Sequence, residues 1–195
     1  GYNLFTDFSE KIKLNKNNLN NFFKKIEKLK KPSNNIVKDI YIGFFGYRLL
    51  CGLINLKKIN QRSNNFPNGI FYKPQTIIKI RKKISIQSNL KNYHILFKKN
   101  IFSKTNILAP FKVNLNLEKY KKIFYQFSKN IKEGKTYQIK ICTKYSNKSK
   151  INPVVFFWKL MKSNAASESF MIRDNNYSIV SCSPETLIEK KGQFI

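Results

Sequence analysis

The sequence predicts an α+β protein in which antiparallel sheets are flanked by helices. Apolar residues recur at helical spacing in two places, residues 15–31 and the segment from Asn116 to Gly134. Strand-like runs lie around these segments, and several are joined by only a few residues. Connections this short can join only antiparallel strands, which favours α+β over α/β. With 42% hydrophobic residues, the chain can bury a core, so disorder is not expected.

The first helix is expected over residues 15–31, where lysines occupy the face opposite the apolar one. Pro32 ends it, because proline disfavours a helical conformation in the residue before it. The apolar face consists of Leu19, Phe22, Phe23, Ile26 and Leu29.

Strand patterns follow over residues 40–47, 70–72 and 76–81. The first run contains Gly43 and Gly46, and glycine within a strand typically marks a bulge or a close approach of another backbone. A short helix is expected directly after this run, at residues 48–51. Pro74 separates the other two runs, so two short strands are expected there.

In the second half, Asn116 can cap a helix that Gly134 ends. Alternating side chains then predict a strand over residues 137–142. Pro153 occupies the first position of a further helix at 154–161.

Two hairpins are expected after this helix. Residues 169–173 and 177–181 are joined by Asp174-Asn175-Asn176, a typical turn sequence. Residues 186–189 and 193–195 predict a second hairpin whose return strand is cut off. Because the chain also begins with glycine rather than methionine, we expect a fragment.

The pattern over residues 98–115 is irregular and predicts a connector between two lobes. We therefore expect an N-terminal lobe at 1–110 and an incomplete second lobe at 116–195.

The chain carries 38 Lys and Arg residues against 10 Asp and Glu, and such an excess raises nucleic acid or an anionic membrane as a partner. The basic residues are nearly all lysine, and asparagine and isoleucine are abundant as well. A/T-rich codons encode all three, so compositional drift explains the charge better than selection for a polyanion. A basic nucleic-acid-binding module stays the alternative class. Steep loss of DNA binding with rising salt would identify it.

Three cysteines, Cys51, Cys142 and Cys182, lack the spacing of a zinc site or a disulfide framework. They are expected to be buried small apolar residues in a protein of the reducing cytoplasm. No apolar run is long enough to predict a transmembrane helix, and no signal peptide pattern is present. His94, the single histidine, has no partners for a catalytic triad.

Four segments occur in a meaningful order: Ile42-Gly43-Phe44-Phe45-Gly46-Tyr47, residues 66–76, residues 131–138, and Ser181-Cys182-Ser183-Pro184-Glu185. In this order they resemble segments of the large subunit (component I) of anthranilate synthase and other chorismate-utilising enzymes. Each motif is weak alone, since a Ser-Pro-Glu turn can simply close a hairpin. Their common order across most of the chain carries the resemblance.

The resemblance implies chorismate as substrate, Mg²⁺ as cofactor and a glutamine amidotransferase subunit as partner. Protein carboxylates hold the metal in such enzymes, and the family's metal-binding glutamates have no counterpart in this chain. We therefore expect neither catalytic nor metal-binding residues here, and no turnover from these 195 residues alone.

Three residues are expected to support the substrate region: Gln138, Ser183 and Glu185. Relatives that add water to chorismate usually carry lysine as general base at the position of Gln138, and an amide cannot accept a proton at neutral pH. The resemblance thus favours the ammonia-adding enzymes. Ser183 and Glu185 lie in the turn that flanks the active site in the family.

Two ammonia-adding branches stay open. Anthranilate synthase is favoured by the match over residues 66–76, and aminodeoxychorismate synthase component I, which serves folate biosynthesis, is the alternative. The family's tryptophan-feedback segment corresponds here to a stretch without prolines, which weakens the case for feedback and for the first branch. The counterpart residues are Ser167, Glu168, Phe170 and Met171.

Overall fold

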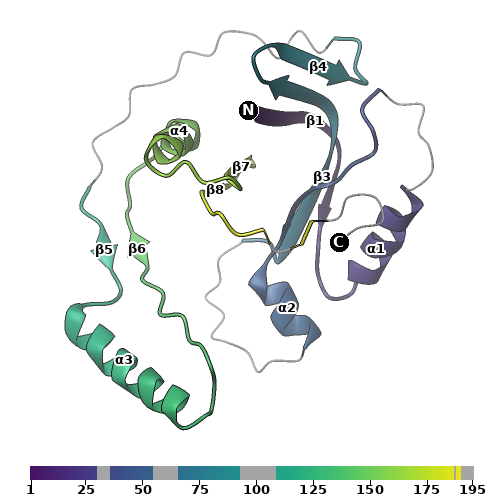
Figure 1. Ribbon diagram of the computed structural model, residues 1–195. Helices are drawn as coiled ribbons and strands as arrows, with labels where there is room; N and C mark the ends of the chain where they lie inside the picture. Colours follow the sequence, from purple (N-terminus) through teal and green to yellow (C-terminus); the bar gives the residue numbers. More distant parts are fainter. Residues whose placement is uncertain (30–35, 55–65, 93–108, 187, 190–195) are drawn as a thin grey trace. The chain divides into compact units, whose positions relative to one another are not determined.

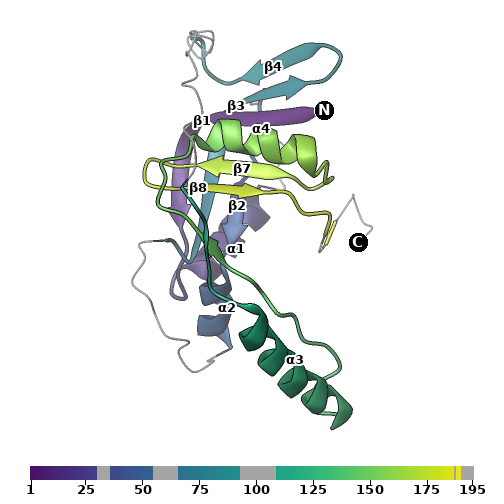
Figure 2. The same cartoon turned by 90° about the vertical axis from the view of Figure 1, so that its left-hand side faces the viewer.

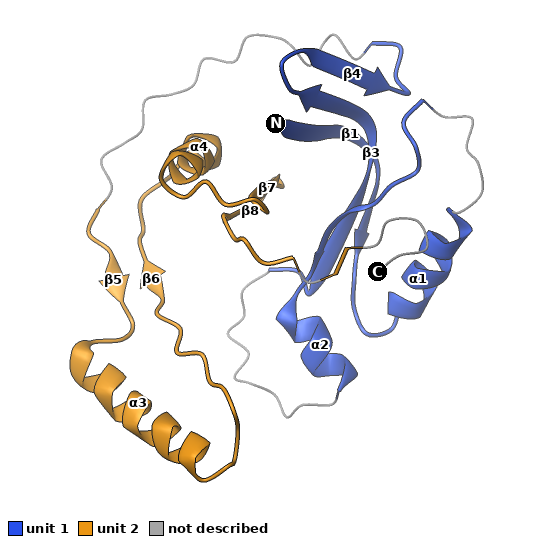
Figure 3. Cartoon of the chain, in the orientation of Figure 1, with its two compact units in different colours: residues 1–100 blue, residues 101–195 orange. Residues whose placement is uncertain are grey.

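The computed structural model describes residues 1–29, 36–54, 66–92, 109–186 and 188–189. The chain divides into two compact units, Gly1–Asn100 and Ile101–Ile195 (Figure 3). Helices and antiparallel sheets occur in both, which confirms the predicted α+β class. The assignment of the lobes to 1–110 and 116–195 stays a prediction.

The first unit contains a four-stranded antiparallel sheet centred on β3 (Gly69–Ile80) (Figure 1). Along one side of β3 lies β1 (Tyr2–Lys13). On the other side, β2 (Ile42–Phe45) pairs with the beginning of β3, and β4 (Ile84–Ser88) pairs with its end.

The prediction of two short strands around Pro74 is wrong, because β3 continues through this proline. Pairing with β2 ends at Tyr72, and pairing with β4 begins at Thr76, so the missing N–H of Pro74 falls in the gap between them. On the opposite side, the register of β1 shifts between Phe8 and Glu10. Pro74 therefore interrupts no regular ladder of hydrogen bonds.

The helix α1 (Leu19–Lys28) forms within the predicted segment and packs its apolar face on the sheet. The ring centroids of Phe22 and Phe71 lie 4.7 Å apart. Burying a large apolar side chain stabilises a fold by roughly 1.5–3 kcal/mol, so this contact fixes α1 on β3. The buried cluster consists of Leu14, Leu19, Phe22, Leu49 and Phe71.

The Gly-x-x-Gly motif brings two backbones together, as its sequence predicted. A Cβ atom on Gly43 would lie 1.9 Å from the carbonyl oxygen of Ile70. The N–H of Gly46 donates to the carbonyl of Asn68 at 2.7 Å, and α2 (Tyr47–Leu53) follows directly. The motif thus allows β2 to pack closely against β3, and α2 begins directly after it.

The described residues of the second unit form two helices and two small antiparallel ladders. The helices are α3 (Leu117–Lys132) and α4 (Pro153–Ser163). One ladder pairs β5 (Lys112–Val113) with β6 (Tyr145–Ser146), and the other pairs β7 (Phe170–Arg173) with β8 (Ser178–Ser181). Figure 2 shows α4 running alongside the hairpin of β7 and β8.

Both helices of this unit begin as predicted, and α3 also ends at the predicted glycine, whereas α4 ends at Ser163 rather than Met161. The side chain of Asn116 accepts from the N–H of Lys119 at 2.9 Å, which caps α3. At the other end, Gly134 has a φ of +70°, and the N–H groups of Gly134 and Lys135 donate to the carbonyls of Ile131 and Asn130. This pair of bonds is a Schellman motif.

In α4, Asn152 caps the helix and Pro153 occupies its first position.

The predicted strand at residues 137–142 is wrong. None of these residues is in a strand, and β6 forms further along, at Tyr145–Ser146. Tyr137 is 92% exposed. A strand needs a hydrogen-bonded neighbour, and residues 137–142 pair with no strand in the described part of the chain. The alternation of apolar and polar side chains therefore did not suffice to form a strand without a neighbouring strand.

Two further expectations change or stay untested. Cys142 is exposed rather than buried, while Cys51 and Cys182 are partly buried, and all three are free thiols. Of the second predicted hairpin, Thr186, Ile188 and Glu189 form no strand, and the return segment lies outside the described residues, as does His94. No helix among the described residues is long and apolar enough to cross a membrane.

Candidate functional site

The hairpin of β7 and β8 places the predicted support residues opposite the predicted regulatory counterpart. Phe170 pairs with Ser181, and two residues further along the same register Glu168 lies opposite Ser183. The N–H of Glu168 donates to the carbonyl of Ser183 at 3.1 Å. The backbone pairing therefore continues past the end of the regular strands and holds the Ser-Pro-Glu turn in place.

Within this turn, the hydroxyl of Ser183 donates to the carboxylate of Glu185. Pro184 between them removes one N–H and fixes its own φ, which restricts the turn. The Glu185 side chain is exposed, while Ser183 is partly buried. Two of the three predicted support residues thus form one polar pair at the end of β8.

The counterpart segment is itself ordered by local hydrogen bonds. The hydroxyl of Ser169 donates to the carbonyl of Ala166 at 2.8 Å, which closes a small turn before β7. Ser167 and Glu168 are exposed, whereas Met171 is partly buried opposite Val180. Phe170 is 43% exposed and faces away from Met171.

Gln138 does not join this group. It lies in the segment that forms no strand, its side chain is exposed, and its carbonyl accepts from the hydroxyl of Thr136 at 3.1 Å. Within the described residues, no hydrogen bond connects Gln138 with Ser183 or Glu185. The structure therefore assembles the Ser183–Glu185 pair and leaves Gln138 apart from it.

The helix α4 supports the hairpin from one side. It contacts both β7 and β8, and the Sγ of Cys182 lies 3.7 Å from the Sδ of Met161. Cys182 directly precedes Ser183, so this sulfur contact ties the turn to the helix. The sequence hinted at this contact through the expectation that Cys182 is buried, and the structure shows it partly buried.

A metal site is not formed by the residues that the structure describes. All ten acidic residues of the chain lie in the described ranges. No three His, Cys, Asp or Glu side chains among the described residues gather closely enough to hold a metal ion. The described carboxylates therefore form no site that fits Mg²⁺.

Three titratable groups with clearly shifted pKa values lie together in the first unit. Glu10 accepts hydrogen bonds from Lys25 and Tyr41, and these bonds hold the pKa of its carboxyl below the ordinary value. The bond from Lys25 to Glu10 raises the pKa of the Lys25 ammonium, and burial together with the Glu10 bond raises that of Tyr41. The cluster joins β1, α1 and the segment before β2, which makes it a structural clamp.

Sequence reasoning missed a cavity in the second unit between the start of α4 and the turn end of the hairpin. Arg173, Tyr177 and Ser178 line it together with apolar side chains. The sequence signal that could have indicated this cavity is Arg173, an arginine at the end of a predicted strand in a chain whose basic residues are nearly all lysine.

Comparisons with known proteins agree with this architecture. Two curated relatives, both called anthranilate synthase component 1, come from Buchnera aphidicola of Rhopalosiphum padi and of Schizaphis graminum. They are 26% and 24% identical to this chain over 170 residues. Each match covers 75% of this chain and 32% of the relative, so the chain spans about a third of their length.

The crystal structure of anthranilate synthase component I from Streptococcus pneumoniae TIGR4 has a similar fold, with a TM-score of 0.75 at 17% identity. The likeness covers 94% of this chain and 50% of that one. The family model described as chorismate binding enzyme matches residues 3–195. Because this match covers nearly the whole length of the chain, the chain belongs to the chorismate binding enzymes.

Proposed function

We propose that this chain is part of an ammonia-adding chorismate enzyme of the anthranilate synthase component I type. The reaction converts chorismate and ammonia, or ammonia from glutamine, to anthranilate, pyruvate and water. The observation that carries the proposal is that both curated relatives have this name and match three quarters of the chain. The product would enter tryptophan biosynthesis in the cytoplasm.

Gln138 supports the choice of ammonia over water as the nucleophile. Its amide cannot serve as a general base on water at neutral pH. The position is exposed and carries no cation, so the described chain offers no lysine base there.

Ser183 and Glu185 would act as positioning residues in this reaction. Their side chains are hydrogen-bonded to each other, and the backbone bond from Glu168 anchors their turn. A turn held in this way presents a fixed carboxylate, which suits the orientation of neighbouring groups better than direct chemistry.

The proposal also includes Mg²⁺ and a second subunit. No carboxylate cluster among the described residues fits Mg²⁺, so no step of the reaction is assigned to the metal here. The relatives are named component 1, and for this chain we extend that to a glutamine amidotransferase partner as ammonia source. The 195 residues alone are expected to form no product.

A chimera tests the proposal. Residues 1–195 would be followed by the part of the Rhopalosiphum padi Buchnera relative that lies beyond its matched segment. Purified chimera with chorismate, ammonium and Mg²⁺ is expected to release anthranilate, detected by its fluorescence.

The alternative, aminodeoxychorismate synthase, would appear in the same chimera assay as a product that only an added lyase converts to 4-aminobenzoate. A chimera that folds by circular dichroism and consumes no chorismate would refute both.

A further inference from the structure

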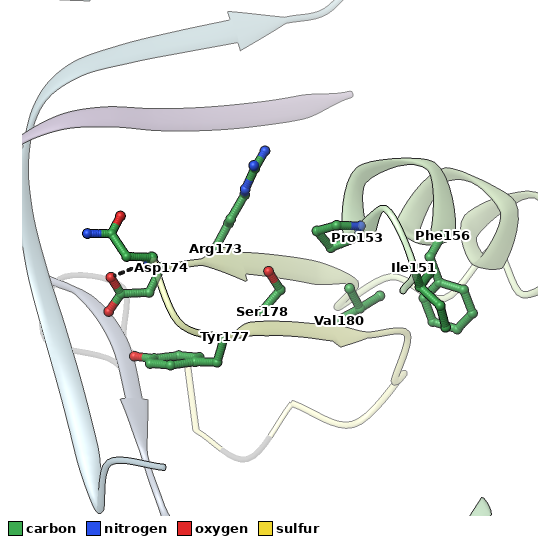
Figure 4. A pocket seen from close by; sticks show the side chains of 9 residues that line it. Ile151, Pro153, Phe156, Arg173, Asp174, Tyr177, Ser178 and Val180 are labelled. Atoms are coloured by element: carbon green, nitrogen blue, oxygen red, sulfur yellow. Dashed lines mark hydrogen bonds between the residues drawn. The ribbon is translucent and has the colours of Figure 1, made fainter. Parts of the chain in front are cut away.

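A cavity of about 530 Å³ opens in the second unit beside the hairpin of β7 and β8 (Figure 4). Its walls come from two elements. Pro153 and Phe156 belong to the first turn of α4, whereas Arg173, Ser178 and Val180 belong to the hairpin. The volume lies within the range of small-molecule sites, roughly 300–1,000 Å³.

The strand register explains why one wall of this cavity is polar at one end and apolar at the other. Arg173 pairs directly with Ser178, and Val180 lies two residues beyond Ser178 on the same face. Figure 4 shows Arg173 and Ser178 extending to the same side of the hairpin. The cation and a hydroxyl thus stand at the turn end, and the apolar Val180 lies toward α4.

Arg173 supplies a permanent positive charge at this end. No carboxylate forms an ion pair with its guanidinium among the described residues. The neighbouring carboxylate of Asp174 accepts from the N–H of Asn175 at 2.7 Å. The fork of N–H donors on Arg173 is therefore available to an anion.

The apolar part of the cavity determines which uncharged group the anionic ligand can have. Phe156, Pro153 and Val180 can cover a ring or a short alkyl chain, and water is released when they do. A single arginine is a weak match for phosphate or a dianion, because a second negative charge would have no cation of its own among the lining residues. The charges thus fit one carboxylate attached to an apolar body.

We propose that this cavity binds small monocarboxylates with an aromatic or aliphatic body. Arg173 holds the carboxylate through two parallel hydrogen bonds, Ser178 donates a third, and the wall of Phe156 and Val180 covers the body. The site lies outside the Ser183–Glu185 pair and takes a monoanion, so its ligand is not the dianion chorismate.

Titration with 3-phenylpropionate tests the proposal on the 195-residue chain, with ligand-observed NMR as the readout. Binding is expected to saturate below about 10 mM, a modest affinity for a ligand of this size. The neutral isostere 3-phenylpropionamide should bind about tenfold more weakly, because it lacks the charge-assisted hydrogen bonds. Inorganic phosphate should not compete.

Two variants locate the binding. Arg173→Gln is expected to weaken 3-phenylpropionate about tenfold. The matched control, Lys162→Gln, removes one positive charge from the end of α4 away from the cavity and should leave binding unchanged. Equal binding of the acid by Arg173→Gln and the unmodified chain would overturn the proposal, and so would equal binding of acid and amide. The amide comparison decides the matter even where a variant fails to fold.

Discussion

The hydroxyl of Tyr41 donates to Oε2 of Glu10 at 2.5 Å, and Lys25 donates to the other oxygen of the same carboxylate. These contacts join three segments that are far apart in the sequence. We expect Tyr41→Phe to lower the free energy of unfolding by about 0.5–1.5 kcal/mol, the usual loss for one hydrogen bond. Urea denaturation of the two proteins at pH 7 measures it.

The same cluster predicts a pH dependence. The pKa of Glu10 is lowered in the folded state by its bonds to Lys25 and Tyr41. Its contribution to stability is therefore complete above the unfolded value of 4.5 and is lost as the pH falls through the lower folded value. Glu10→Gln should remove this acid-side decline, measured as urea midpoints between pH 3 and 6. An unchanged profile in Glu10→Gln would contradict the prediction.

Gly43 and Gly52 form a matched pair for the packing of the first unit. A Cβ on Gly43 would lie 1.9 Å from the Ile70 carbonyl oxygen, whereas one on Gly52 would meet nothing within 4 Å. Gly43→Ala should therefore destabilise the chain by about 3 kcal/mol or more, since β2 must separate from β3. Gly52→Ala, within α2, should stabilise it by about 0.5–1 kcal/mol. Thermal unfolding followed by circular dichroism compares the two, and equal melting temperatures would refute this account of Gly43.

Local signals in the sequence predicted the fold better than long-range ones. Asn116, Gly134 and Pro153 were identified because a helix end is decided within a few residues. The strand at 137–142 failed because strand formation depends on a partner that alternation does not reveal. The strand β1 was missed although Tyr2, Leu4 and Phe8 alternate, since a register shift interrupts the pattern beyond Phe8.

The candidate site was predictable in part for the same reason. Ser183 and Glu185 belong to one short turn, so their contact follows from adjacency. The bond between Glu168 and Ser183 follows from the hairpin register, which the predicted turn at 174–176 nearly fixes. Gln138 was grouped with them by family resemblance alone, and no hydrogen bond among the described residues connects it with them.

Gly134 ends α3 in a conformation that only glycine adopts without strain. Its φ is +70°, and a Cβ there would meet nothing within 4 Å, so backbone conformation alone decides the effect of a substitution. Gly134→Ala should cost about 1–2 kcal/mol. Amide hydrogen exchange at the last turn of α3 measures the cost locally. The control is Lys132→Ala, two residues before Gly134 at the last position of α3. It should leave the protection of these amides unchanged within a few tenths of a kcal/mol.

Glu185 is predicted to position groups in the completed enzyme without taking part in bond making. In the chimera, Glu185→Ala should reduce kcat about tenfold or more, because the carboxylate that Ser183 fixes is lost. Glu185→Gln retains an acceptor for the Ser183 hydroxyl and should recover most of the rate. The control is Glu168→Ala, which removes a carboxylate from the opposite position but keeps the N–H that donates to Ser183. Wild-type turnover and stability in Glu185→Ala would show that the turn only closes the hairpin.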